Sequence, residues 1–440
     1  MSTSLVLAGG IAAPNASLAS GSRSSAETAR SGFVVRPNIV ARSCNGGHGS
    51  KLSTTGWKQP VVATGTMSDG ATLVAFSQVY PGKDYSVLDA VTPRCVRATG
   101  FGTAGETTIT IPKDVVPLPG NGFGFDALWI ESIGARAGGG ALVAGTYRGR
   151  WVVAAIDSSG TLDPAFGTAG WTVLPRRGEV SAILQEPSGR ILVAGDNGGG
   201  GCCTVNHVAA LSSRGRLLTS FGKQGAATLP TGEDSGVDSL LREPNGDLLA
   251  LVRYGNMGCW GVGVAMLTPA GHHVAGFAKR MTQFWGSLAF GAFDGAIYVT
   301  PHGFTLAGAG QHPCFGRVPA KSVTGVMARF RTDGASVGRT VRFPSRDFGV
   351  LGAFKSGRDT LFVDSKFADD TRARLRVLRP DGTAKPSFGH DGEVIVRAPW
   401  QGSSAQLATG LAVKGDDPTS LVIVATRDGR QQIQIVRLHI

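Results

Sequence analysis

Hydrophobic and polar positions along most of the chain alternate with a period of two residues, which is typical of β-strands and not of helices. Short apolar runs, such as ILVAG at 191–195, follow turns that contain glycine. Glycine adopts the positive φ of tight hairpin turns at little cost. The pattern predicts seven β-hairpins, and their turn-and-strand segments begin at Ser68, Gly138, Pro187, Pro244, Phe293, Lys355 and Asp416.

A second pattern also occurs seven times. An alternating strand ends in an apolar anchor residue, and the anchors are about 58 residues apart on average. They are Val91, Ile156, Leu211, Leu267, Phe330, Leu378 and Leu438. A repeat of this length indicates one supersecondary unit, built seven times.

A third pattern is the phrase FGTAG at 101–105, which recurs as FGTAG at 166–170, FGKQG at 221–225 and FGHDG at 388–392. Each copy begins ten residues after its anchor and precedes another short strand. One unit therefore reads strand, hairpin, strand, strand, Phe-Gly turn, strand. We expect each phenylalanine to pack beneath the neighbouring unit while the glycines form the turn.

Four antiparallel strands per unit, repeated without helical periodicity, predict an all-β fold: a seven-bladed β-propeller of four-stranded antiparallel blades. The last unit lacks its fourth strand, because the sequence ends at RLHI. We expect SKLSTTGW, Ser50–Trp57, to supply that strand. An N-terminal strand would then close the ring and leave no exposed sheet edge.

LDPAFGTAG, with PSGRILVAG following it, resembles the delta-60 repeat of bacterial, often exported, propeller proteins. The resemblance runs from about Trp57 to the end of the sequence. It weakens at Gly276–Lys279 and Gly334–Val341, where the Phe-Gly turn is eroded. The resemblance implies the propeller fold and transfers no catalytic residue.

The composition fits a globular protein rich in tight turns: of 440 residues, 42% are hydrophobic and 17% charged, with 65 glycines and 22 prolines. We expect residues 31–440 to form a single β-propeller domain. Residues 1–30 resemble a signal peptide with a flexible tail, although no lysine or arginine precedes the apolar stretch SLVLAGGIAA. The sequence thus predicts a secreted or cell-surface monomer without a membrane span.

The six cysteines form an even set, as is common in an oxidising compartment. Cys203 and Cys259 each stand eight residues before an anchor, so they occupy equivalent places in neighbouring units. Reduced, buried thiols are the alternative, and a bridge between the adjacent Cys202 and Cys203 is another. The candidate disulfide cysteines are Cys44, Cys95, Cys202, Cys203, Cys259 and Cys314.

Motifs of common enzymes are absent from the sequence: it has no P-loop, HExxH, GxSxG or paired CxxC. His272 and His273 are expected to lie exposed in a turn and not to bind a metal. We therefore predict no cofactor, no metal site and no catalytic residue. The formal charge of +12 is spread over scattered residues without a basic run, which argues against nucleic acid as a partner.

The connections between second and third strands differ in length from unit to unit, whereas the hairpin turns and Phe-Gly turns are uniform. In a propeller these two kinds of connection lie on opposite faces, here named the variable face and the uniform face. Binding sites usually lie on variable loops held by a rigid scaffold. The candidate ligand-binding residues on the variable face are Tyr80, Tyr147, Arg148, Arg150, Arg253, Tyr254, Phe315 and Arg317.

Aromatic rings stack on sugars, and guanidinium groups bind carboxylate or phosphate, so these residues indicate an anionic glycan or cell-wall polymer as ligand. The alternative is that the aromatic residues anchor the loops while the cations are solvated. Another surface protein is a further candidate partner. The sequence favours a binding module over an enzyme, and a channel-sited lyase or hydrolase acting on a sugar polymer is the alternative function.

Overall fold

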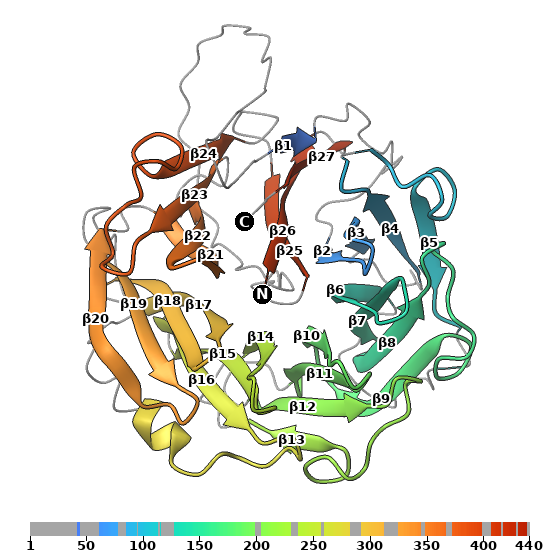
Figure 1. Ribbon diagram of the computed structural model, residues 1–440. Helices are drawn as coiled ribbons and strands as arrows, with labels where there is room; N and C mark the ends of the chain where they lie inside the picture. Colours follow the sequence, from blue (N-terminus) through green and yellow to red (C-terminus); the bar gives the residue numbers. More distant parts are fainter. Residues whose placement is uncertain are drawn as a thin grey trace, which may run out of the picture.

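The computed structural model of the chain is an all-β, propeller-like structure (Figure 1). The strands of the described residues form seven antiparallel sheets, which stand around a common centre in Figure 1. The structure describes residues 42–44, 61–77, 85–94, 96–112, 115, 127–198, 204–229, 236–256, 259–281, 292–311, 324–344, 348–366, 372–397, 406–414, 417–427 and 430–437.

The first three sheets along the chain each contain four strands in sequential order. The first contains β2 (Val61–Thr66), β3 (Thr72–Ser77), β4 (Tyr85–Val91) and β5 (Glu106–Thr110). The second contains β6 (Leu128–Ala135), β7 (Ala141–Tyr147), β8 (Arg150–Ile156) and β9 (Trp171–Arg177). The third contains β10 (Val180–Gln185), β11 (Ile191–Asp196), β12 (Asn206–Leu211) and β13 (Ala226–Thr228).

The remaining sheets follow the same order, apart from the last. The fourth contains β14 (Gly236–Arg242), β15 (Leu248–Asn256) and β16 (Cys259–Leu267). The fifth contains β17 (Ala292–Thr300), β18 (Gly303–Gln311), β19 (Thr324–Arg331) and β20 (Ser336–Pro344), and the sixth β21 (Phe348–Ser356), β22 (Asp359–Lys366), β23 (Arg372–Leu378) and β24 (Glu393–Arg397). The seventh contains β25 (Gln406–Lys414), β26 (Asp417–Arg427), β27 (Arg430–Arg437) and β1 (Arg42–Cys44).

An N-terminal strand pairs with the last strand of the chain, although it is not the strand that the sequence indicated. β1 runs antiparallel to β27, with Arg42 opposite Arg437, and the two lie side by side in Figure 1. The predicted segment, Ser50–Trp57, lies outside the described residues. The strand that pairs with β27 is instead the short RSC stretch, Arg42–Cys44.

One predicted hairpin is wrong. The Asp294-Gly295 dipeptide lies inside β17, where Gly295 is opposite Gly308, and the hairpin turn is instead at Pro301-His302. β18 therefore begins at Gly303. A central Gly in an extended strand gives the same local sequence as a turn, so only strand pairing separates the two.

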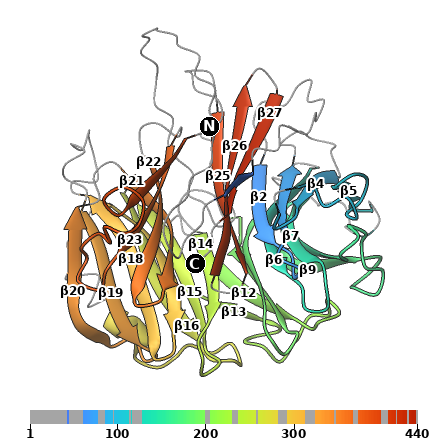
Figure 2. The same ribbon diagram turned by 45° about the horizontal axis from the view of Figure 1, so that its top comes forward.

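The hydrophobic core forms layers between neighbouring sheets. β2, β6, β10, β14, β17, β21 and β25 contact one another in this order, and β2 also contacts β25. These are the strands nearest the centre in Figure 1, and Figure 2 shows the same sheets from a tilted view. Between the second and third sheets, for example, Trp151 and Phe166 pack with Val193 and are fully buried. Each sheet is thus stabilised mainly by its two neighbours.

The Phe-Gly turns have one repeated geometry. In the second sheet, Phe166 is fully buried and Gly167 has φ +56°, where a Cβ atom would lie 2.0 Å from the Trp171 carbonyl oxygen. Ala169 and Gly170 also have positive φ. The turns at Phe101, Phe221 and Phe388 repeat this arrangement. The phrase is structural, as the sequence predicted.

The same turns join neighbouring sheets through the backbone. Gly167 N–H donates to the Arg214 carbonyl of the third sheet at 2.9 Å, and a Cβ on Gly215 would come within 2.8 Å of the Phe166 ring. The ring therefore covers a turn glycine of the following sheet. Equivalent hydrogen bonds run from Gly102 to Ser159 at 2.6 Å and from Gly222 to Ala270 at 2.8 Å.

Candidate functional site

Several of the candidate ligand-binding residues have no described side chain. Tyr80, Phe315 and Arg317 lie outside the described residues, and so does the side chain of Tyr254 in β15. Arg253, also in β15, forms an ion pair with Asp238 of β14 at 2.9 Å. A guanidinium that already binds a carboxylate inside its own sheet is a weaker candidate for a ligand anion.

Tyr147, the last residue of β7, does not present its ring to solvent. It is 1% exposed and belongs to the hydrophobic layer between the first and second sheets. The prediction that it stacks on a sugar is therefore wrong, because alternation along β7 turns it into the core with Val143. The buried Arg148 lies over this ring, 5.1 Å from its centroid, so this aromatic–cation pair anchors the loop.

Arg150, the first residue of β8, is the best-placed of the predicted residues. It lies directly opposite Arg177 of β9. Burial lowers the pKa of His207, and the positive charge of Arg176 lowers it further. None of these three arginines forms an ion pair with another described residue. Arg150 and Arg177 form a basic strip at the end of the second sheet that lies on the variable face.

Three carboxyl groups lie beside this strip, between the second and third sheets, and the sequence did not reveal them. A β-bulge in β6 places Glu131 so that its Oε2 accepts hydrogen bonds from Thr146 Oγ1 at 2.9 Å and from Val180 N–H at 3.1 Å. Glu179 directly precedes β10, and Asp196 ends β11. The acidic cluster, Glu131, Glu179 and Asp196, therefore joins three strands.

Burial shifts the protonation of this cluster. The pKa of Glu131 is raised, mainly by burial and further by the negative charge of Glu179. Burial and then the charge of Asp196 raise the pKa of Glu179 from 4.5 to about 7. The pKa of Asp196 is also raised by burial, against the opposing hydrogen bonds from Glu179 N–H and Gly198 N–H. With a pKa of about 7, the Glu179 carboxyl is partly protonated at neutral pH.

We expect the Glu179→Gln variant to be more stable than the wild type at pH 8, by on the order of 2 kcal/mol. The raised pKa means that the folded state binds more protons than the unfolded state between pH 4.5 and about 7, so wild-type stability falls as pH rises through this window. Urea unfolding at pH 5 and pH 8 measures the effect. The advantage of the variant should shrink at pH 5, whereas a Glu106→Gln control should follow the wild type. A pH-independent difference would contradict the assignment.

A second charged cluster that the sequence did not reveal lies in the sixth sheet. The Asp364 carboxylate is fully buried and forms ion pairs with Arg374 at 2.9 Å and Arg376 at 2.8 Å. Arg376 also lies over the rings of Phe343 and Phe362, 4.8 and 5.1 Å from their centroids. These contacts join the fifth and sixth sheets, so we interpret the cluster as structural.

The described side chains include no cysteine, so the predicted disulfides lie outside the described residues. Within those residues, no three His, Cys, Asp or Glu side chains are grouped to hold a metal ion. Over the same residues, no helix is long and apolar enough to span a membrane.

No protein-family model matches the chain, and no curated protein is similar to it in sequence. Several solved propeller-type structures have a similar shape. An ulvan lyase shares 11% identity at a TM-score of 0.47, covering 85% of this chain and 91% of its own. Another polysaccharide lyase shares 11% identity at 0.45, covering 85% and 89%. Drosophila semaphorin 1b shares 10% identity at 0.40, covering 86% and 85%.

Proposed function

We propose that this chain is a secreted or cell-surface binding module that holds an anionic glycan or cell-wall polymer on its variable face. The basic strip carries the proposal. Arg150 and Arg177 are directly opposed across two strands, where like charges destabilise a sheet. Neither arginine forms an ion pair with a described carboxylate. A bound polyanion would offset the repulsion, and guanidinium groups bind carboxylate, sulfate or phosphate bidentately.

We expect an Arg150→Gln/Arg177→Gln variant to bind acidic polysaccharides about ten- to a hundredfold more weakly than the wild type, because each lost charged hydrogen bond costs about 1.5–3 kcal/mol. The measurement is a binding titration with alginate, hyaluronan and a teichoic acid at low and physiological salt, with neutral dextran for comparison.

An Arg214→Gln/Arg216→Gln variant is the matched control, because it removes the same charge from exposed residues on the uniform face. Equal weakening in both variants would indicate attraction by net charge alone. If the wild type binds none of the three polyanions, the proposal is refuted.

We further propose that the fold is a seven-bladed β-propeller of the delta-60 type, closed by β1. The contact between β2 and β25 and the pairing of β1 with β27 support closure. We expect deletion of residues 1–40 to leave the melting temperature unchanged and deletion of residues 1–45 to lower it by several degrees, because the second deletion exposes the edge of β27. Equal melting temperatures for the two truncations would contradict closure by β1.

A specific observation favours a second function: a lyase or hydrolase acting on a sugar polymer. A carboxyl with a pKa of about 7 exchanges its proton at neutral pH, as general acid–base catalysis requires, and Glu179 follows directly after Arg176-Arg177-Gly178. If this function is correct, the release of reducing ends from a bound polyanion should be lost in Glu179→Gln while binding remains. A polyanion that binds without being cleaved would leave only the first proposal.

A further inference from the structure

The seam between the third and fourth sheets differs from the two before it. The hydrogen bond from Gly222 to Ala270 brings Lys223 beside Gly271 and His272 on the uniform face. The residues equivalent to Lys223 are Thr103 and Thr168 in the first and second sheets. Of the three seams between the first four sheets, this is therefore the one at which the repeat places a lysine next to a histidine.

His273, the next residue along the chain, departs from the repeat as well. Leu162 and Leu217 fill the space beside the last glycine of their own Phe-Gly turns, at 2.9 and 2.7 Å from a Cβ built on Gly170 and Gly225. In the fourth unit, His273 replaces the leucine and Met281 replaces the glycine. Residues 277–281 form a short helical turn instead of the Phe-Gly turn.

Phe277 nevertheless keeps the place of the turn phenylalanine. It is 1% exposed, and a Cβ on Gly334 of the fifth sheet would lie 2.7 Å from its ring. The contact with the next sheet is thus retained while the turn around it has changed. The Phe-Gly turn is thus lost in the fourth unit, whereas the packing of its phenylalanine is kept. Such departures from a repeated sequence are expected at functional sites.

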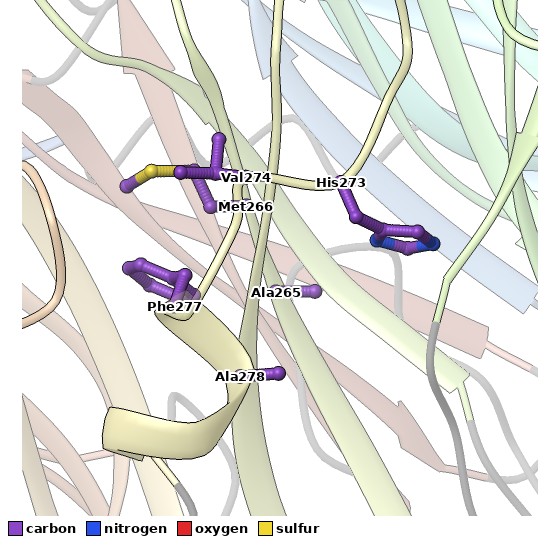
Figure 3. A pocket seen from close by; sticks show the side chains of 6 residues that line it. All are labelled: Ala265, Met266, His273, Val274, Phe277 and Ala278. Carbon is purple, nitrogen blue, oxygen red and sulfur yellow. The ribbon is translucent and has the colours of Figure 1, made fainter.

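Two cavities share His273: a polar one at this seam and an apolar one formed by residues of the fourth unit alone. An apolar cavity of about 120 Å³ is lined by Ala265, Met266, His273, Val274, Phe277 and Ala278. In Figure 3, His273, Ala265 and Ala278 extend to one side of β16, and Phe277 and Met266 to the other.

A polar cavity of about 300 Å³ is lined by Gly222, Lys223, Ala226, Ala227, Thr228, Gly271, His272 and His273. No acidic residue lines either cavity. The side chains of Lys223, His272 and His273 are exposed and make no hydrogen bond or ion pair with another described residue. Three nitrogen donors thus face one solvent-accessible hollow with their capacity unused.

We propose that this seam binds a small oxyanion, a carboxylate, sulfate or phosphate, carried by a molecule of about monosaccharide size. Lys223, His272 and His273 donate to the anion in the polar cavity. The apolar cavity beside His273 takes the uncharged part of the molecule. This site lies on the uniform face and is independent of the glycan proposed for the variable face.

Calorimetric titration at pH 6 with inorganic sulfate, inorganic phosphate and glucuronate tests the site. The variants His273→Leu and Lys223→Thr restore the residues that the repeat has elsewhere, so both should fold. We expect each variant to weaken binding of at least one anion about tenfold or more. The Arg150→Gln/Arg177→Gln variant should retain this binding, which separates the site from the variable face.

His390→Gln is the matched control, because His390 is 96% exposed in the Phe-Gly turn of the sixth unit, also on the uniform face. It should bind the anions as the wild type does. Absence of binding to all three anions in the wild type would overturn the proposal. So would equal affinities of the wild type, His273→Leu and Lys223→Thr in proteins with matching melting temperatures.

Discussion

Replacing Asp364 by asparagine is expected to lower the free energy of unfolding by about 3–5 kcal/mol. Its carboxylate is the shared anion between Arg374 and Arg376, and all three side chains are almost fully buried. Asparagine is nearly isosteric but neutral, so the variant would remove the buried charge that both guanidinium groups share, and Arg374 would keep only the longer ion pair with Glu393 at 3.5 Å. Denaturant unfolding measures the loss.

Asp359→Asn is the matched control for this change. Asp359 lies in the same strand and pairs with Lys385 at 2.8 Å, but that lysine side chain is 37% exposed. Solvent-exposed pairs contribute about 0–1 kcal/mol, so the control should be nearly as stable as the wild type. If both variants lose a similar amount of free energy of unfolding, burial does not explain the contribution of Asp364 to stability.

Replacing Phe166 by alanine is expected to cost a similar amount, about 3–5 kcal/mol. The ring is fully buried and packs against Gly215, so its removal leaves a cavity in the layer between the second and third sheets. Phe166→Leu keeps most of the volume and should cost much less. The measurement is again the free energy of unfolding.

A double-mutant cycle with Gly215→Ala tests whether the contact crosses the seam. An alanine Cβ at this position would come within 2.8 Å of the Phe166 ring. Gly215→Ala should therefore cost less in the Phe166→Ala background than in the wild type. Strict additivity of the two changes would mean that the ring and the turn glycine do not interact.

The sequence predicts the repeated parts of this molecule well because they depend on local backbone requirements. A Phe-Gly turn needs several residues with positive φ, so Gly102, Gly167, Gly222 and Gly389 recur at fixed spacing. The hairpin at Phe293 was misplaced because Gly295 lies in an extended strand, where glycine gives no turn.

The residues of the candidate site were much harder to predict from the sequence. Glu131 lies in β6, Glu179 directly before β10 and Asp196 at the end of β11, and a bulge in β6 together with the seam between two sheets brings them close. No local pattern encodes such a meeting. The burial of Tyr147 could have been predicted, since it ends the largely apolar run ALVAGTY, and all seven residues of this strand are buried.

The placement of each turn phenylalanine has a consequence for how the chain folds during synthesis. Phe101 and Phe166 cover Gly160 and Gly215, which the ribosome adds about 50–60 residues later. A newly made sheet therefore cannot bury its own phenylalanine until the next sheet has emerged. While the first four units are made, the nascent chain therefore presents one unburied ring, that of Phe101, Phe166, Phe221 or Phe277, until the next unit covers it.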